Sequence, residues 1–552
     1  MNRLRTLGCN LICFAGSLPG YIRFQHAARH PRPCQRRRMR RLLHRNRATD
    51  YGREHNVTQI DSWEAFTELP LTDYDDYGKA VQQILNGAQE VLTGEPVTIL
   101  QPTSGTSSSP KLIPYTAALG AEFKAALDAW LFDLYVQRPK LLGGPQYWSI
   151  SPASENNVRS GEHVPVGFLD DAEYFGARRR WMMDSIMAVP SEVRMITDMQ
   201  ANQYVTLLFL LRETNLRLMS VWHPSFLTIL LGVMRDKWPH LLRDVAHGGI
   251  APDVNVADEI RQRLASRLRP APRRSHELGD LALGAANICG AIWPHLQIIS
   301  CWRDGQVASE IAELEGLFPG VLIQGKGLLA TEGVVSIPLG PSQQHVCAVT
   351  SHILEFQDDR GVVHPLWDVT SGAVYCVILT TAGGLYRYQL RDRVEVTGMY
   401  HKTPCVRILG RAGVVSDGVG EKLHLEHVEA IVARIAAFYF KQPRFMVLVP
   451  SSHDGTRHYR LLVETGRRED APDLAAVAAA LEGELCRNYH YAHARQLGQL
   501  AAAAVIRLAP NAQARYQELM VRAGGIAGTI KCPALCTVPG MEAHVVAAPE
   551  RR

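Results

Sequence analysis

A run of small hydroxyl residues has the chemistry of a phosphate-binding loop. Thr103–Pro114 reads T-S-G-T-S-S-S-P-K-L-I-P, so that Lys111 follows a single glycine and several serines. Hydroxyl and backbone N–H groups donate hydrogen bonds to phosphate oxygens, and a lysine ammonium supplies the opposite charge. The apolar residues Pro96–Leu100 predict a short buried strand before this loop. The spacing does not fit G-x-x-x-x-G-K-[ST], and a serine-rich surface turn explains the stretch equally well when it is considered alone.

A second segment places a carboxylate beside a hydroxyl. Gly325–Gly333 reads G-K-G-L-L-A-T-E-G and stands between the apolar runs Val321–Ile323 and Val334–Ile337. The pattern predicts a strand and a glycine-rich turn, followed by Thr331 and Glu332. Carboxylate oxygens bind hard cations such as Mg²⁺, which would bridge Glu332 to the phosphates of a nucleotide.

Two later segments could complete a nucleotide site. The motif Y-R-Y-Q-L-R-D ends at Asp392, and an aspartate at the start of a strand could accept hydrogen bonds from both hydroxyls of a ribose. Further on, Arg411 leads through G-E-K-L to a helix expected at Leu425–Ile435. Each segment is weak evidence by itself, whereas the order and spacing of the four together are specific.

Taken together, these segments resemble the Gretchen Hagen (auxin-responsive) acyl-acid amido synthetases in their bacterial form, a family of adenylate-forming enzymes. The resemblance runs nearly from end to end. Further segments that carry it are residues 42–52, residues 70–77, Ser220–Leu227, Trp293–Leu296, Asn488-Tyr489 and Gly528–Pro533.

The resemblance implies a fold and a two-step reaction. The expected fold is α/β, with a large composite N-terminal domain (1–410) of mixed or parallel sheets plus a barrel-like subdomain, and a small hinged α+β C-terminal domain (411–552). First, a carboxylic acid attacks the α-phosphate of ATP, which gives an acyl-adenylate and pyrophosphate. An amine, typically that of an amino acid, then attacks the acyl carbon and releases AMP. Such catalysis is mostly positioning and neutralisation of charge.

The resemblance also implies a role for each candidate residue. The triphosphate would be held by Ser104, Gly105, Thr106, Ser107 and Lys111. Thr331 would contact the α-phosphate, and Glu332 would hold Mg²⁺. Asp392 would hold the ribose, and Arg411 would lie at the hinge between the domains, where it could contact the nucleotide. Lys531 would be carried over the α-phosphate by the small domain, and we hypothesise that rotation about the hinge later exchanges it for a channel that admits the amine.

The chain departs from the pattern of the family in three places. Serines occupy positions 107–109 where relatives often have glycine, and Leu328 stands where plant relatives place a tyrosine near the adenine. Arg391 precedes Asp392 where relatives usually have glycine. None of these changes removes a charged group, so the site is expected to be intact.

Composition is that of a globular protein of several cores. The chain has 552 residues, of which 46% are hydrophobic and 20% charged, and a length of about 100–200 residues per domain suggests roughly three to five units. No apolar run approaches the ~18 residues that a membrane-spanning helix needs. The eleven cysteines are odd in number and lack the spacing of a zinc site, which favours reduced thiols and a cytoplasmic location. We expect a monomer with no membrane span.

The first 49 residues contain no acidic residue and many arginines, most densely in Gln35–Arg41. Such a segment could bind nucleic acid, or could be a targeting segment, because Leu7–Leu18 is mildly apolar. We favour a third interpretation, an opening helix of the family with Leu42 and Leu43 facing inward and arginines outward. No aromatic residue that would stack on bases is interleaved with the arginines of Gln35–Arg41, so no nucleic-acid partner is expected.

The remaining pattern predicts the elements that position these motifs. Helices are expected at Ala117–Val136, Val205–Leu218, Phe226–Trp238 and Leu474–Tyr489. Strands are expected at Leu218–Val221, Leu296–Cys301, Val346–Val349, Val374–Thr380, Val394–Thr397 and Leu500–Ile506, with a hairpin formed by Arg444–Val449 and Tyr459–Glu464. The segment Arg267–Arg274 is expected to be an exposed loop. The acyl pocket is expected to be lined from Tyr147–Ser151, the region of Trp222, and Cys301–Trp302.

Two other functions share the same motifs. An acyl-CoA ligase would form the same adenylate and pass the acyl group to a thiol. A non-catalytic protein that binds a nucleotide or a small acid would keep the loop without the reaction. The resemblance to the amido synthetases covers almost the whole chain and favours ligation of a small carboxylic acid to an amine, with ATP and Mg²⁺ as cofactors.

Overall fold

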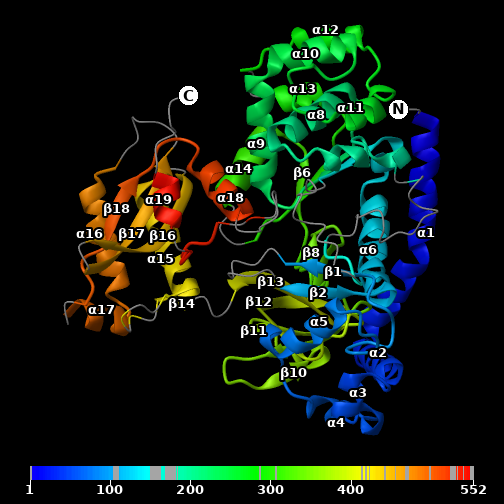
Figure 1. The fold of residues 1–552 in the computed structure, drawn as a ribbon, viewed down its shortest axis with the longest axis vertical. Coiled ribbons are helices and arrows are strands. Elements are labelled where there is room, and N and C mark those ends of the chain that lie inside the picture. Colours follow the sequence, from blue (N-terminus) through cyan, green and yellow to red (C-terminus); the bar gives the residue numbers. More distant parts are fainter. Residues whose placement is uncertain are drawn as a thin grey trace.

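Figure 1 shows the fold of the protein in a computed structural model. The structure describes residues 3–103, 111–149, 163–167, 182, 184–284, 287–304, 308–411, 415–416, 419, 421, 423–440, 443–453, 456–465, 472–496, 499–522, 530, 532–538 and 540–546. The predicted α/β fold is confirmed, with two large sheets in the N-terminal part and a smaller sheet in the C-terminal part. Within the described ranges, no helix is both long enough and apolar enough to cross a membrane.

A parallel sheet in the order β3-β4-β5-β6 forms one half of the large part. Its strands are β3 (Gln146–Trp148), β4 (Leu218–Ser220), β5 (Ile298–Cys301) and β6 (Leu322–Gly325). The helices between them are α8 (Met199–Arg212), α9 (Pro224–Asp236), α10 (Trp238–His247), α11 (Asp258–Ala265), α12 (Pro272–Gly279), α13 (Ile288–Ile292) and α14 (Ala308–Leu317). These elements share one hydrophobic core. Because the strands are parallel and in register, their carboxyl ends meet at one edge.

An antiparallel sheet in the order β10-β9-β11-β12-β13-β8-β7 forms the other half. Its strands are β7 (Ser336–Leu339), β8 (Gln344–Cys347), β9 (Ile353–Gln357), β10 (Val363–Pro365), β11 (Val374–Thr380), β12 (Tyr388–Tyr400) and β13 (Thr403–Arg411). The strand expected at Val374–Thr380 is β11, and the one expected at Val394–Thr397 lies within β12. A separate hairpin is formed by β1 (Ile99–Pro102) and β2 (Leu112–Tyr115).

The N-terminal helices cover this half. They are α1 (Arg3–Arg29), α2 (Pro31–Asn46), α3 (Asp50–Glu54), α4 (Trp63–Thr67), α5 (Gly78–Leu85) and α6 (Ala117–Gln137). In Figure 1, α1 (dark blue) runs along the outer edge beside α6, and the ring of Phe14 stacks on that of Phe132 at 4.7 Å. Leu42 and Leu43 of α2 are buried, so the helix and the inward placement predicted for these two leucines are confirmed, whereas Arg38 of the same helix does not face outward as predicted.

The C-terminal part has cores of its own, made only of residues from Leu423 onward. It contains β14 (Val415–Ser416), β15 (Leu423–His424), α15 (Leu425–Tyr439), β16 (Pro443–His453), β17 (Thr456–Thr465), α16 (Leu474–Leu485), α17 (Tyr489–Gln496), β18 (Ala504–Arg507), α18 (Ala512–Arg522) and α19 (Met541–Val546). In Figure 1 it stands beside the large part, with α18 against α9 and α14. Two hydrogen bonds join them here, from Gln517 Nε2 to Ser225 Oγ at 3.1 Å and from Gln513 Nε2 to Glu310 Oε1 at 3.4 Å. The division near residue 410 stays a prediction.

Several expected bounds are wrong in detail. The helix expected at Val205–Leu218 is α8, which ends at Arg212, the helix expected at Leu474–Tyr489 ends at Leu485, and the strand expected at Leu500–Ile506 begins at Ala504. Arg274 does not lie in an exposed loop, because α12 begins at Pro272 and the guanidinium donates to the backbone oxygens of Leu211 (2.9 Å) and Ile292 (2.8 Å). The strand expected at Pro96–Leu100 begins later, at Ile99. Proline has no N–H for a strand ladder, which is consistent with this shift.

Candidate functional site

The hairpin of β1 and β2 holds both ends of the predicted phosphate loop. Thr103 N donates to Lys111 O at 2.8 Å, so the chain leaves and re-enters the hairpin at adjacent positions. Lys111 Nζ lies 5.3 Å from the centroid of the Tyr74 ring, and Tyr74 Oη accepts a hydrogen bond from Leu112 N at 2.6 Å. The candidate residues Ser104, Gly105, Thr106 and Ser107 lie outside the described residues.

The second candidate segment is a tight turn whose two tip residues are Thr331 and Glu332. Ala330 N donates to Gly333 O at 2.9 Å and Gly333 N returns a bond to Ala330 O at 3.2 Å. Leu329 and Val334 form an antiparallel bridge below them. Glu332 is buried, with 5% of its surface exposed.

A hydrogen bond from Tyr115 joins this turn to the hairpin. Tyr115 closes β2, and its hydroxyl donates to Thr331 O at 2.6 Å across 216 residues of sequence. The ring of Tyr115 is almost fully buried, whereas Thr331 is half-buried. The structure therefore brings together the base of the serine-rich loop and the turn that carries Glu332, as the nucleotide interpretation requires.

A buried network of hydrogen bonds supports the turn. The sequence did not predict this network. His352 Nε2 accepts a hydrogen bond from Val334 N at 2.9 Å, and His352 Nδ1 lies 2.8 Å from Glu122 Oε2. Because a backbone N–H can only donate, Nε2 is unprotonated and the ring proton lies on Nδ1, facing the carboxylate. His352 has no exposed surface.

Glu122 lies at the centre of this hydrogen-bond network. Its Oε2 also accepts from Ala382 N at 2.9 Å, and its Oε1 pairs with Arg38 NH1 at 2.9 Å. Arg38 belongs to the arginine-rich stretch of α2 and also donates to Thr350 O. At least this arginine of the basic segment therefore faces inward, where it balances a buried carboxylate.

Close packing fixes the turn further. A Cβ added at Gly333 would lie 2.8 Å from His352 Nε2 and 3.0 Å from its Cδ2. Since real Cβ atoms do not approach so closely, a larger residue would displace the histidine or the turn. Glycine at this position is explained by contact with His352.

The predicted ribose residue Asp392 lies inside a strand and not at its start. β12 begins at Tyr388, and Asp392 is paired in register with Arg411 of β13. The two candidates are therefore neighbours along the backbone, although the side chain of Arg411 lies outside the described positions. Arg391, the residue before Asp392, has a φ of +64°, a conformation that favours glycine. Its guanidinium binds both carboxylate oxygens of Asp73, at 3.1 and 2.9 Å.

The Y-R-Y part of the same motif is structural. Arg387 is buried and binds Glu355 through two hydrogen bonds of 3.1 Å. Tyr386 donates to Leu92 O at 2.9 Å and accepts from Asn46 Nδ2 at 2.8 Å. These contacts tie the residues just before β12 to α2, to β9 and to the loop that contains Leu92, and so help to fix the strand that carries Asp392.

The segments expected to line the acyl pocket meet at the carboxyl ends of the parallel strands. Ser149 N donates to Ser220 O and Trp302 N to Trp222 O, both at 2.8 Å. In α/β sheets, ligands commonly bind at this edge. Burial raises the pKa of the Cys301 thiol to about 12, which keeps it protonated and unsuited to act as a nucleophile.

Lys326 is a further residue at this edge, and sequence reasoning gave it no role. It follows β6 directly, its Nζ donates to Ser220 Oγ at 2.6 Å, and it lies 5.3 Å from the centroid of the Trp222 ring. The signal in the sequence is the lysine between two glycines immediately after a buried strand. Its ammonium places a positive charge at this edge, beside the ring of Trp222.

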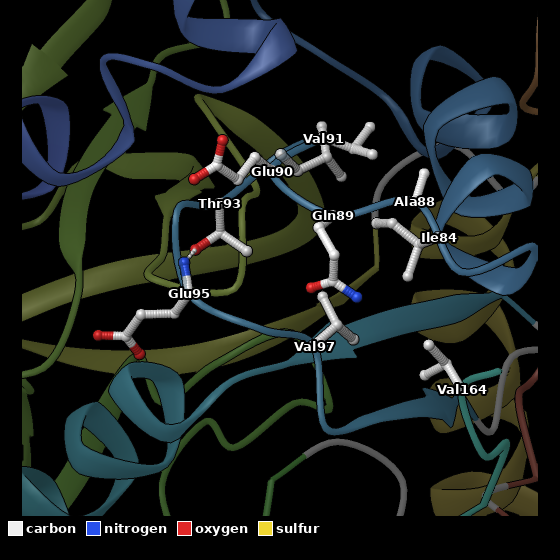
Figure 2. Close-up of a pocket in the computed structure, with 10 residues that line it drawn as sticks. Ile84, Ala88, Gln89, Glu90, Val91, Thr93, Glu95, Val97 and Val164 are labelled. Carbon is white, nitrogen blue, oxygen red and sulfur yellow. Dashed lines mark hydrogen bonds between the residues drawn. The ribbon is translucent and has the colours of Figure 1, made fainter.

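Figure 2 shows a pocket elsewhere, below the loop between α5 and β1. Its lining runs from Ile84 to Val97 and includes Val164, with none of the candidate residues. Glu95 in this pocket is engaged by Arg45 at 3.0 Å and by Ala118 N at 2.9 Å. The pocket is therefore separate from the candidate site. Lys531 lies beyond the described positions.

Comparison with known proteins identifies the relatives of this chain. Three family models match it: the GH3 family N-terminal domain at residues 21–323, the central domain at 347–411 and the C-terminal domain at 426–539. The indole-3-acetic acid-amido synthetase GH3.4 of Arabidopsis thaliana is 23% identical over 532 residues, which cover 90% of this chain and 87% of that protein. The probable indole-3-acetic acid-amido synthetase GH3.12 of Oryza sativa subsp. japonica is 25% identical, and the match covers 71% of each.

A solved structure has the same fold. The AtGH3.15 acyl acid amido synthetase in complex with 2,4-DB superimposes with a TM-score of 0.84 at 19% identity, over 96% of this chain and 95% of that one. The likeness therefore extends over both the large and the small part.

Proposed function

This chain belongs to the GH3 family, and from that premise we propose that it is an ATP-dependent acyl-acid amido synthetase. The observation that supports this most directly is the hydrogen bond from Tyr115 to Thr331, which joins the base of the serine-rich loop to the turn carrying Glu332. This bond holds the base of the segment suited to phosphate next to the segment suited to a cation, which supports a shared site. The substrates are a small carboxylic acid and an amine, most naturally that of an amino acid, because the relatives are named for amide synthesis.

In the first step, a carboxylate oxygen attacks the α-phosphorus of ATP. The bond to the bridging oxygen of the β-phosphate breaks, and pyrophosphate leaves. Ser104, Gly105, Thr106, Ser107 and Lys111 hold the triphosphate. Thr331 contacts the α-phosphate, and Asp392 holds the ribose with Arg411 beside it. These contacts orient the phosphorus for attack and balance charge at the reacting group.

Glu332 offers one carboxylate to a Mg²⁺ ion. This ion usually takes one or two protein carboxylates and fills its other positions with water and substrate phosphates. A single buried carboxylate at the tip of a fixed turn, close to a phosphate loop, is suited to that role. When bound, the ion supplies positive charge that neutralises the phosphates.

In the second step, the amine nitrogen attacks the acyl carbon, the bond from that carbon to the phosphate oxygen breaks, and AMP leaves. The nitrogen loses a proton as the amide forms. We place Lys531 over the α-phosphate in the first step and, by rotation of residues 411–552 against 1–410, away from it in the second. We propose that the protein acts as a monomer in the cytoplasm.

Exchange of labelled pyrophosphate into ATP tests the proposed function. We expect exchange that depends on a carboxylic acid and on Mg²⁺, across a panel of aliphatic, aromatic and indolic acids. Adding amino acids should then give amide and AMP in the absence of coenzyme A. Exchange without amide, but with thioester when coenzyme A is added, would show an acyl-CoA ligase. No exchange with any acid would contradict adenylation.

Lys326 gives a test of the acid subsite. We propose that its ammonium binds the carboxylate of the acid before attack, at the edge formed by Ser220 and Trp222. A hydrogen bond to a charged group contributes about 1.5–3 kcal/mol, so Lys326→Met should raise KM for the acid about 10- to 100-fold with little change in KM for ATP. Lys79→Met, on the exposed face of α5, is the matched control. An unchanged KM for the acid would remove Lys326 from the subsite.

A further inference from the structure

Helix α1 presents an apolar face to solvent. Thirteen large hydrophobic side chains are exposed in the described part of the chain, and six of them lie on this one helix. They are therefore clustered, unlike the single exposed hydrophobic residues that are common on protein surfaces. They are Leu4, Leu7, Leu11, Ile12, Leu18 and Ile22. Leu4 is 81% exposed, Ile12 55% and Ile22 57%.

The orientation of α1 is fixed by its opposite face, which contains several polar residues. Thr6, Asn10 and Ser17 are buried, whereas leucines point outward. Asn10 Nδ2 donates to Leu142 O and Gly144 O, both at 3.0 Å. Because these bonds are lost if the helix rotates about its axis, the leucines cannot turn into the core without exposing Asn10.

Close packing against α6 prevents rotation as well. A Cβ added at Gly20 would lie 2.5 Å from Asp128 Cβ, and Phe14 stacks on Phe132. The apolar face of α1 is therefore a fixed surface feature. Proteins seldom leave such a face in water without a use for it.

The charge around this face is positive. The first 49 residues include twelve arginines and no acidic residue. Arg3 and Arg5 begin the helix and Arg23 and Arg29 end it, all exposed, while Lys140 is exposed in the adjoining turn Pro139–Gly143. The acidic residues of the neighbouring helix α6, Glu122, Asp128 and Asp133, are buried.

We propose that the outward face of α1 binds the surface of an anionic lipid bilayer. A helix with an apolar face and arginines at its ends can insert its leucines at the boundary between headgroups and acyl chains while the arginines bind lipid phosphates. A second copy of the chain would bring arginines against arginines, and a nucleic acid would leave the leucines in water. An anionic bilayer satisfies both the charge and the apolar surface.

The placement of α1 leaves the remainder of the protein accessible. In Figure 1 the helix forms the edge of the molecule opposite the C-terminal part. Docking through α1 would therefore not cover α18 or the strands around Glu332. The protein would be held at a membrane surface by the edge that lies opposite its C-terminal part.

Flotation of the full-length protein with vesicles tests this proposal. We expect binding to vesicles of phosphatidylcholine with phosphatidylglycerol, and little binding to phosphatidylcholine alone. The double variant Leu11→Glu/Ile22→Glu should bind the anionic vesicles at least about tenfold more weakly, because it places two negative charges in the apolar face. Raising the salt from about 0.1 to 0.5 M should weaken binding by the wild type, because salt screens the arginines.

The matched control is Phe438→Glu. Phe438 is 82% exposed on α15, away from α1, so this variant should bind vesicles as the wild type does. Thermal unfolding and the mass in solution are measured for each protein. Equal vesicle binding by the double variant, or no binding by the wild type, overturns the proposal. A dimer that the double variant converts to a monomer, without vesicle binding, would show that a second copy covers the face instead.

Discussion

Replacing Glu332 with glutamine is expected to reduce carboxylate-dependent pyrophosphate exchange by about 10²–10³-fold, the usual effect of removing one preorganised charged contact. Glutamine keeps the size of the side chain and one acceptor oxygen, but it replaces the other oxygen with an NH2 donor and lacks the negative charge that would hold Mg²⁺. Because Glu332 is one of two residues at the tip of a turn closed by reciprocal backbone bonds, the substitution should leave the turn in place. The loss should therefore appear in catalysis and not in stability.

The dependence on Mg²⁺ identifies the cause of this loss. If Glu332 holds the ion, the concentration of Mg²⁺ that gives half-maximal exchange should rise in Glu332→Gln. Glu313→Gln, an exposed glutamate on α14, should behave as the wild type in both measurements. Exchange within a few-fold of the wild type at every Mg²⁺ concentration would rule out the assigned role.

Replacing His352 with phenylalanine is expected to produce the largest loss of stability. The change leaves Val334 N–H without its acceptor and removes a donor from Glu122, both inside the core. Each buried polar group left unsatisfied costs about 1–3 kcal/mol, so the free energy of unfolding should fall by about 2–5 kcal/mol. The turn that presents Thr331 and Glu332 should also loosen, and KM for ATP should rise.

A conservative variant separates the hydrogen bonds from the packing. In His352→Gln, the amide oxygen could accept from Val334 N–H while the amide nitrogen donates to Glu122, so much of the stability and of the KM for ATP should be recovered. Urea unfolding and pyrophosphate exchange measure the two properties. A phenylalanine variant as stable as the wild type would show that the hydrogen-bond network has no supporting role. A glutamine variant no more stable than the phenylalanine variant would show the same.

Local sequence patterns predicted many of the elements. The helix expected at Ala117–Val136 is α6, one residue longer, and the strand expected at Val374–Thr380 has those same bounds as β11. Both follow from apolar periodicity over a continuous stretch. The hairpin predicted from Arg444–Val449 and Tyr459–Glu464 is formed by β16 and β17. The short β2 was not predicted, because four residues after a serine-rich loop carry almost no periodic signal.

Contacts between distant residues could not be predicted in this way. His352 and Glu122 are 230 positions apart, and neither has a neighbour in the sequence that indicates the other. The same holds for Tyr115 and Thr331. Arg391 was only partly predictable. The resemblance indicated a position that relatives fill with glycine, and the positive φ is consistent with that. The ion pair of Arg391 with Asp73 is visible only in the fold.

The most direct test of the central claim is a crystal structure with a non-hydrolysable acyl-adenylate analogue. We expect the group that replaces the phosphate to lie between residues 104–107 and Thr331, with the ribose on Asp392 and the acyl group at the carboxyl ends of β4 and β5. Lys531 should approach the same group in the adenylation conformation. An analogue bound elsewhere, with the Glu332 turn and the serine-rich loop both free of contact with it, would contradict the account.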